Sequence, residues 1–198
     1  MAKTMFEVKI SNVSRNNTQN VTGMYGSFAD TVFTGADCPA GRLVVKSGEL
    51  PMEGYASKGI KNKSAFYMVD ATNGNAGGMY GDHTGIYFCA NKDVNVVGGY
   101  GLGINTLGLT LPAGERGAFC EAIIGETYAV GADDFATLPT DGSLYATISN
   151  GRLVATSELP SAGSGVYFEL GGTTPVNAGA SYWGERYYIT AKRTAEAA

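Results

Sequence analysis

The chain has 198 residues, with 29 glycines, 12 tyrosines, a charged fraction of 16% and a formal net charge of −4. An acidic chain gives no electrostatic support for binding to nucleic acid or to an anionic membrane surface, so we expect neither as a partner. So few charged residues are typical of a protein whose surface is largely covered by neighbours. A glycine-rich β domain that does not assemble is the alternative.

The N-terminal segment contains one short predicted strand, residues 5–10, followed by a polar stretch rich in asparagine. Its first residues, MAKTMFEVKI, lack the apolar core of a signal peptide, so we expect synthesis in a host cytoplasm. We interpret residues 1–20 as an arm that pairs with a neighbouring molecule.

Short strands are predicted along the rest of the chain. No window of a dozen residues combines a 3.6-residue apolar period with a cap at each end. Asn150-Gly151 predicts a tight hairpin turn, because both residue types accept positive φ angles. The glycines of residues 113–125 favour a strand over a short helix. Eight segments are β-branched or aromatic between Gly, Pro, Asn or Asp residues: 43–45, 65–69, 85–89, 107–111, 144–148, 153–156, 166–170 and 187–191. The predicted fold class is all-β, as a sandwich or distorted barrel.

An internal repeat indicates that this β structure is built twice. GRLVVKSGELP at residues 41–51 recurs as GRLVATSELP at residues 151–160, and GIYF at residue 85 is echoed by GVYF at residue 165. The repeat predicts two related β units from an internal duplication, residues 21–112 and 113–198. Chance similarity between glycine-rich segments is the alternative.

The two copies differ by a long insert in the first, residues 52–84, where the second has only four residues. Insertions of this size are tolerated best in surface loops, which often carry function. We therefore expect deletion of residues 58–81 to leave the fold intact and to abolish association. Solvated lysines in an ordinary loop are the alternative. The predicted partner-binding residues are Lys58, Lys61, Lys63, Phe66, Tyr67 and Tyr80.

Catalytic patterns are weak, so we predict that the protein is not an enzyme. The sequence has no P-loop pattern and no serine in a G-x-S-x-G elbow. Its single histidine, His83, follows Asp82 and is predicted to be a surface or hydrogen-bonding residue. Two carboxylate pairs are candidates for glycoside hydrolysis, Glu121 with Glu126 and Asp133 with Asp134. We interpret the second pair as a solvated turn, since neighbouring residues on a strand point to opposite faces.

Cysteines and aromatic residues give two further expectations. Cys38, Cys89 and Cys120 are widely spaced and odd in number, which predicts buried free thiols instead of a disulfide or metal site. We expect no cofactor and no metal. Aromatic residues also gather near the C-terminus, at Tyr182, Trp183, Tyr187 and Tyr188. We interpret this group as a core position, with a sugar-stacking platform as the alternative.

The segment LTLPAGERGAFCEAIIGETYAVGADDFATLPTDGSLYATISNGRLV, residues 109–154, resembles small virion proteins of tailed bacteriophages, of the head-decoration or cement type. The resemblance implies a non-enzymatic structural protein on the exterior of the virion capsid. Its implied partner is the major capsid protein, whose neighbouring subunits it would bridge, and it would form a homo-oligomer such as a trimer. A carbohydrate- or receptor-binding module of a phage fibre or tail is the alternative function.

Overall fold

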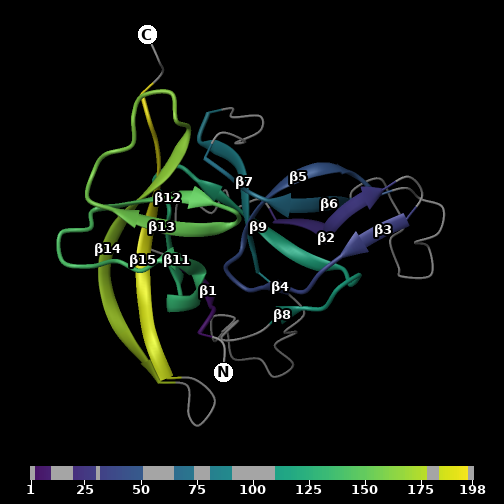
Figure 1. The fold of residues 1–198 in the computed structure, drawn as a ribbon, viewed down its shortest axis with the longest axis horizontal. Coiled ribbons are helices and arrows are strands. Elements are labelled where there is room, and N and C mark those ends of the chain that lie inside the picture. The colour runs from purple at the N-terminus through teal and green to yellow at the C-terminus, as the bar shows by residue number, and fades with distance from the viewer. Residues whose placement is uncertain are drawn as a thin grey trace.

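The computed structural model describes residues 3–9, 20–29, 32–50, 65–73, 81–90, 110–177 and 183–195, and its ordered elements in this part of the chain are strands and one 3₁₀ turn at Ala132–Asp134 (Figure 1). The all-β prediction is confirmed. The strands are β1 (Phe6–Lys9), β2 (Asn20–Ala29), β3 (Val32–Gly35), β4 (Cys38–Pro39), β5 (Leu43–Glu49), β6 (Ala65–Asp70), β7 (His83–Cys89), β8 (Thr110–Leu111), β9 (Gly117–Ile123), β10 (Thr127–Val130), β11 (Phe135–Thr137), β12 (Tyr145–Ser149), β13 (Arg152–Thr156), β14 (Val166–Asn177) and β15 (Trp183–Arg193).

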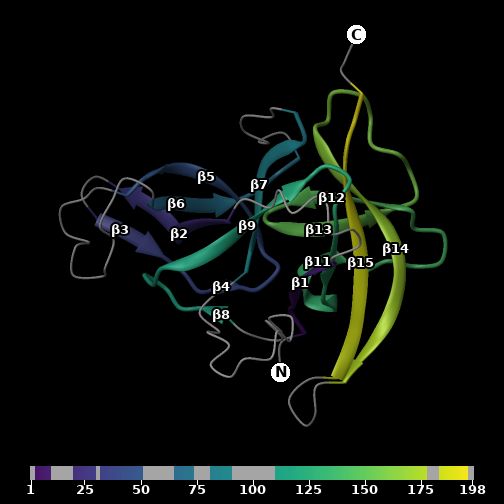
Figure 2. The same ribbon diagram turned by 180° about the vertical axis from the view of Figure 1, so that it is seen from behind.

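The strands form two main layers, which lie side by side in Figures 1 and 2. One is a seven-stranded sheet in the order β1-β10-β15-β14-β12-β13-β11. The other has the order β3-β2-β6-β5-β7-β9, and β2 also pairs with β9. This extra pairing closes β2, β6, β5, β7 and β9 into a ring, which we call the barrel. All its pairings are antiparallel except that of β2 with β6. The sequence predicted a sandwich or a distorted barrel; the two layers form a sandwich-like arrangement, and one of them closes into a ring.

Three strands of the barrel have segments that are covered on both faces, because these segments lie between two cores. On β7, Ile86 and Phe88 belong to the large core shared with the seven-stranded sheet, whereas Tyr87 and Cys89 belong to a second cluster with Met68. Residues 43–45 of β5 and residues 119–122 of β9 alternate in the same way, whereas Lys46, Ser47 and Glu49 of β5 are exposed. Successive side chains of a strand point to opposite faces, so a strand covered on both sides becomes a continuous apolar run. This arrangement explains why such runs carry little charge.

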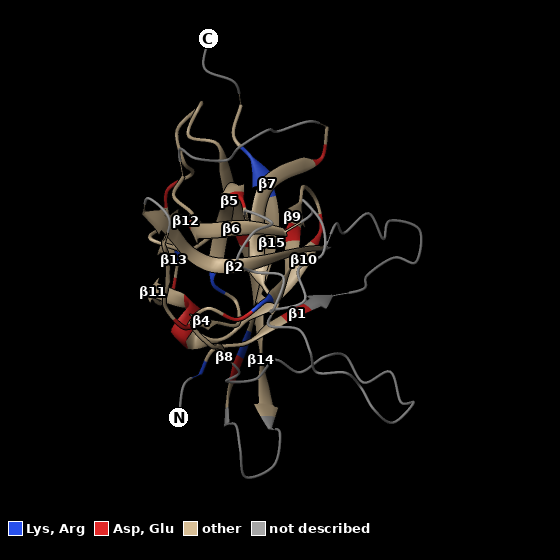
Figure 3. Ribbon diagram, turned by 90° about the vertical axis from the view of Figure 1, so that its right-hand side faces the viewer, with Lys and Arg blue, Asp and Glu red and all other residues tan. Residues whose placement is uncertain are grey.

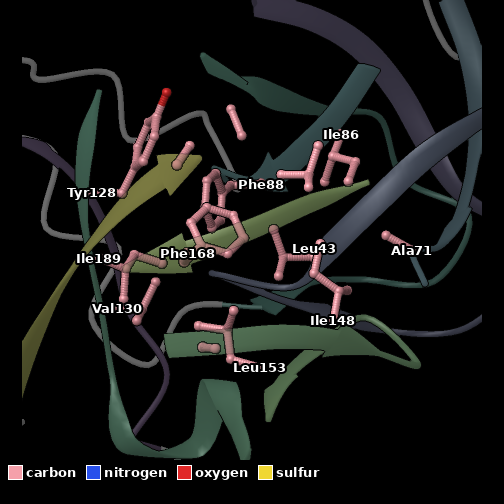
Figure 4. Packing of buried hydrophobic residues seen from close by; sticks show 14 of the residues in the cluster. Leu43, Ala71, Ile86, Phe88, Tyr128, Val130, Ile148, Leu153, Phe168 and Ile189 are labelled. Carbon is pink, nitrogen blue, oxygen red and sulfur yellow. The ribbon is translucent and has the colours of Figure 1, made fainter. Parts of the chain in front are cut away.

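Phe88 lies at the centre of the large core and is fully buried (Figure 4). Its ring centroid is 4.8 Å from those of Phe6 and Tyr128 and 5.8 Å from that of Phe168. The buried Tyr128 hydroxyl accepts a hydrogen bond from the Ile123 amide (2.8 Å) and donates one to a carbonyl oxygen (3.1 Å). Burying one large apolar side chain stabilises a fold by about 1.5–3 kcal/mol, so this aromatic group joins the two layers strongly.

The predicted hairpin between β12 and β13 is confirmed. Asn150 and Gly151 have φ angles of 47° and 71°, which is the left-handed region that such a turn requires. A Cβ atom on Gly151 would lie 2.5 Å from Oδ1 of Asp70, so this close approach also requires glycine. The turn contacts the barrel directly, because the Leu43 amide donates to the Gly151 carbonyl at 2.9 Å.

The structure does not confirm a duplicated unit. In the first repeat β5 pairs with β7, but in the second β13 pairs with β12 and β11, and β14 pairs with β12 and β15. The layers also do not divide at residue 112, since β9 closes the barrel. The sequence predicted that residues 1–20 form an arm that pairs with a neighbouring molecule. In this structure β1 pairs with the chain's own β10, and Asn20 begins β2 of the other layer. Residues 10–19 lie outside the described part.

The predicted insert, residues 52–84, contains a central strand of the barrel. β6 lies between β2 and β5, and its Met68 is fully buried. The expectation that residues 58–81 are dispensable for folding is therefore wrong, because their deletion would remove this strand. From the sequence repeat, β6 was interpreted as part of an insert, because the second copy has no matching residues at that position.

Candidate interaction surface

The predicted partner-binding residues are only partly described. Lys58, Lys61, Lys63 and Tyr80 lie outside the described residues. Phe66 and Tyr67 are half-buried on β6 and pack in different clusters, as expected for successive residues of a strand. The Tyr67 ring lies 5.8 Å from that of Phe28, and Nζ of Lys46 lies 4.2 Å above the Phe66 ring. Both rings therefore contribute to packing, and their contact with a partner stays a prediction.

Three strongly exposed leucines mark a different surface, which sequence reasoning missed. Among the described residues the exposed large hydrophobic side chains are Val32, Leu138, Leu144 and Leu159, with exposures of 61%, 48%, 55% and 60%. Val32 lies on β3 at the edge of the second layer. The three leucines belong to segments around β11, β12 and β13 of the seven-stranded sheet.

Strand directions place the leucines at one end of that sheet. β11 runs parallel to β13, and β12 runs antiparallel to β13, so the C-terminal ends of β11 and β13 adjoin the start of β12. Leu138 directly follows β11, Leu144 directly precedes β12, and Leu159 lies three residues after β13. The Leu144 amide also donates to the Thr156 carbonyl at 3.0 Å. We call Leu138, Leu144 and Leu159 the leucine edge.

The leucine edge adjoins β11, an edge strand of the seven-stranded sheet. β11 is the last strand in its sheet and pairs only with β13 in the described part of the chain. Phe135 anchors it, buried and 5.2 Å from the ring of Tyr187, while Ala136 and Thr137 are exposed. The charged residues drawn in Figure 3 are scattered over the ribbon, with acidic and basic segments interspersed. The acidic turn Asp133-Asp134 directly precedes β11, so this edge of the sheet carries both exposed apolar side chains and acidic residues.

The structure brings His83 to Glu121, 38 residues away in sequence. Their strands β7 and β9 are paired, and Nδ1 of His83 lies 2.8 Å from Oε2 of the buried Glu121. The Gly85 amide donates to Oε1 of the same carboxylate at 2.9 Å. His83 is thus a hydrogen-bonding residue, as the sequence predicted, and its contacts support a buried carboxylate.

We expect His83→Ala to lower the free energy of unfolding by about 1–3 kcal/mol, because the buried Glu121 carboxylate loses one of its two partners. Denaturant unfolding of the wild type and the variant measures this change. His83→Gln, which keeps a polar N–H group at this position, serves as the matched control and should lose less. Equal stability of His83→Ala and the wild type would show that the contact contributes nothing.

The prediction of a solvated turn at Asp133-Asp134 is wrong for Asp134, which is buried. Its Oδ2 accepts hydrogen bonds from the amides of Gly131 (2.7 Å) and Met5 (3.0 Å), and Oδ2 of Asp133 accepts one from the Lys3 amide (2.5 Å). Burial, opposed by these bonds, raises the pKa of the Asp134 carboxyl well above its usual range. The sequence pattern could not reveal the N-terminal partners, which lie about 130 positions away.

Of the C-terminal aromatic group, Tyr182 and the Trp183 side chain lie outside the described residues. Tyr187 and Tyr188 are half-buried and pack against the large core and a small cluster around Met5, which agrees with the core interpretation. The Thr174 hydroxyl donates to that of Tyr188 at 3.3 Å. These contacts leave the sugar-stacking alternative without support from these two rings.

The prediction of buried free thiols is confirmed for Cys38, Cys89 and Cys120. Burial and the neighbouring Glu121 raise the pKa of Cys120 to about 12, which keeps its thiol protonated and unreactive near neutral pH. Within the described residues no three His, Cys, Asp or Glu side chains are grouped as metal ligands would be. In the same residues, no helix is long and apolar enough to cross a membrane. Comparison of the chain with protein-family models, curated proteins and solved structures finds no match.

Proposed function

We propose that this protein is a capsid decoration protein, which binds the outer surface of an assembled phage head and bridges neighbouring subunits of the major capsid protein. The leucine edge is the observation that carries the proposal. Three leucines that are about half or more exposed at one end of a sheet favour a surface that a partner covers. The proposed location is therefore the capsid exterior, after assembly in the host cytoplasm.

The chemistry of the surface suits a structural contact. Burying leucine side chains against a partner contributes roughly 25 cal/mol per Å² of apolar area, without any catalytic group. On one side of the adjoining β11 no described strand pairs, and an extended segment of a partner could add there as a further strand. Such a contact uses main-chain hydrogen bonds for affinity and the leucines for specificity.

The rigidity of the body supports the same role. The two layers share one large core, which the aromatic contacts of Phe88 connect. A protein that reinforces a particle must transmit force between its contacts, and close packing gives interiors low compressibility. We place a second contact at Lys58, Lys61 and Lys63, which would face acidic groups of the major capsid protein, and we propose a homo-oligomer, such as a trimer.

A triple variant of the leucine edge, with Leu138, Leu144 and Leu159 each replaced by serine, should lose at least tenfold in affinity for capsids in a co-sedimentation assay. Its stability should change little, because exposed side chains contribute within about 0.5 kcal/mol each. Val32→Ser is the matched control, since Val32 is equally exposed but lies on β3 in the other layer. Undiminished binding by the triple variant would exclude the leucine edge as the contact.

The alternative function is a carbohydrate- or receptor-binding module of a phage fibre or tail. A chain that fails to sediment with capsids, binds glycans on an array, and loses that binding in a folded Trp183→Ala variant would favour it. Decoration would be favoured if the leucine-edge triple variant lost capsid binding while Trp183→Ala bound capsids as the wild type does.

A further inference from the structure

The N-terminal strand β1 is held through its main chain, through two buried side chains and through an ion pair of Glu7 with Arg186 (2.8 Å). It pairs with β10 from Phe6 opposite Val130 to Lys9 opposite Thr127. Before the strand begins, Asp133 and Asp134 accept hydrogen bonds from the amides of Lys3 and Met5, and the Asp133 amide donates to the Lys3 carbonyl at 3.2 Å. We call the edge of β10 together with these two aspartates the β1 slot.

Two side chains of the N-terminal segment complete the interior. Met5 and Phe6 are 1% and 5% exposed, and the Phe6 ring stacks on Phe88 at 4.8 Å between centroids. Removal of the segment would therefore open the large core to water and leave the Asp134 carboxylate without one of its donors. The slot must be filled for the body to stay folded.

The contacts do not depend on which copy supplies the strand. The residues joined by the aspartate bonds are 129 and 130 positions apart in sequence. β1 is the last strand of its sheet and has β10 as its neighbour in the described residues, while the next strand, β2, belongs to the barrel. Residues 10–19 join the two layers, and ten residues reach at most about 33–36 Å when fully extended.

We propose that β1 is exchanged between copies of this chain, so that the N-terminal strand of one copy fills the β1 slot of a second. The exchanged contacts are the same as those within one copy. The balance between monomer and strand-exchanged oligomer therefore depends on protein concentration and on the segment that connects β1 to β2. An edge strand is suited to exchange because only one ladder of hydrogen bonds has to re-form. The partner is a second copy, so this inference does not depend on capsid binding.

Cysteine cross-linking tests the exchange in the full-length chain. Glu7 lies directly opposite Ala129 in the β1–β10 ladder, where Cβ atoms are about 4.5–5.5 Å apart. Glu7→Cys and Ala129→Cys chains are mixed in denaturant, refolded together and oxidised. Exchange predicts a disulfide-linked heterodimer whose yield rises with protein concentration.

The double variant Glu7→Cys/Ala129→Cys shows that the two thiols can react within one chain, and a wild-type mixture shows that the native buried cysteines do not cross-link. If the double variant closes its disulfide but the mixed single variants give no heterodimer at any concentration, the proposal is overturned. Because Ala129 is buried, Lys9→Cys with Thr127→Cys, the opposed pair two residues further along the ladder, repeats the test at a second position. Monomers that bind capsids without cross-linking would overturn exchange and leave the proposed function standing.

Discussion

Replacing Phe88 by alanine is expected to lower the free energy of unfolding by about 3–5 kcal/mol, the range for truncating a large aromatic side chain in a core. Phe88 is fully buried and its ring contacts those of Phe6, Tyr128 and Phe168. These partners lie on or beside the seven-stranded sheet, whereas Phe88 lies on β7 of the barrel. The cavity would therefore weaken the contact between the layers as well as each layer.

Unfolding in denaturant, followed by tryptophan or tyrosine fluorescence and by circular dichroism, measures this loss. Leu159→Ala is the control, since Leu159 is 60% exposed and should change stability by less than about 0.5 kcal/mol. The shared core also predicts that both probes report one transition. Two separate transitions, or a Phe88→Ala cost below 1 kcal/mol, would contradict the description of a single core.

Asp134→Asn is expected to reduce the pH dependence of stability. Burial raises the pKa of the Asp134 carboxyl in the folded protein above its value in the unfolded chain. The folded state therefore binds the proton more tightly, and the stability from this group is complete below the unfolded pKa and is lost as pH rises through the folded pKa. Asparagine keeps the hydrogen-bond acceptor for Met5 and Gly131 but does not titrate, so this part of the profile should disappear.

Asp134→Ala gives the larger loss at this position. Two amides would be left without their acceptor, and each unpaired buried group costs about 1–3 kcal/mol. Denaturant unfolding between pH 4 and pH 8 measures wild type, Asn and Ala variants together, and the difference between wild type and Asn isolates Asp134 from other carboxyl groups. If the stability difference between wild type and Asp134→Asn stays constant with pH, or grows in favour of the wild type as pH rises, the raised pKa of Asp134 is contradicted.

The strands that the sequence predicted best are those with a strong local signal. β7, β9 and residues 43–45 of β5 contain apolar runs because both faces are covered there, and Asn150-Gly151 marks its hairpin by positive φ angles. β2 was not predicted, since its glycines and polar residues dilute any alternation. Closure of the barrel depends on the pairings of β2 with β6 and β9, which join segments far apart in sequence and have no local signature.

The candidate surfaces were harder to predict than the fold. Leu138 and Leu159 each precede a proline in a short loop, but their exposure depends on where β11 and β13 end in space. Asp134 has the sequence pattern of a solvated turn, but the return of the N-terminal strand to β10 and the close approach of Gly41 bury it. The repeat misdirected attention to residues 52–84 because similarity in sequence did not correspond to similarity in strand pairing.

The most direct test of the proposed function is sedimentation of the purified chain with assembled tailed-phage capsids and, separately, with unassembled major capsid protein. Decoration predicts saturable binding at a fixed ratio to capsid subunits, present on the assembled particle and lost with the leucine-edge triple variant. The account would be contradicted by a chain that stays in the supernatant at saturating capsid concentration while Val32→Ser and the wild type are both folded.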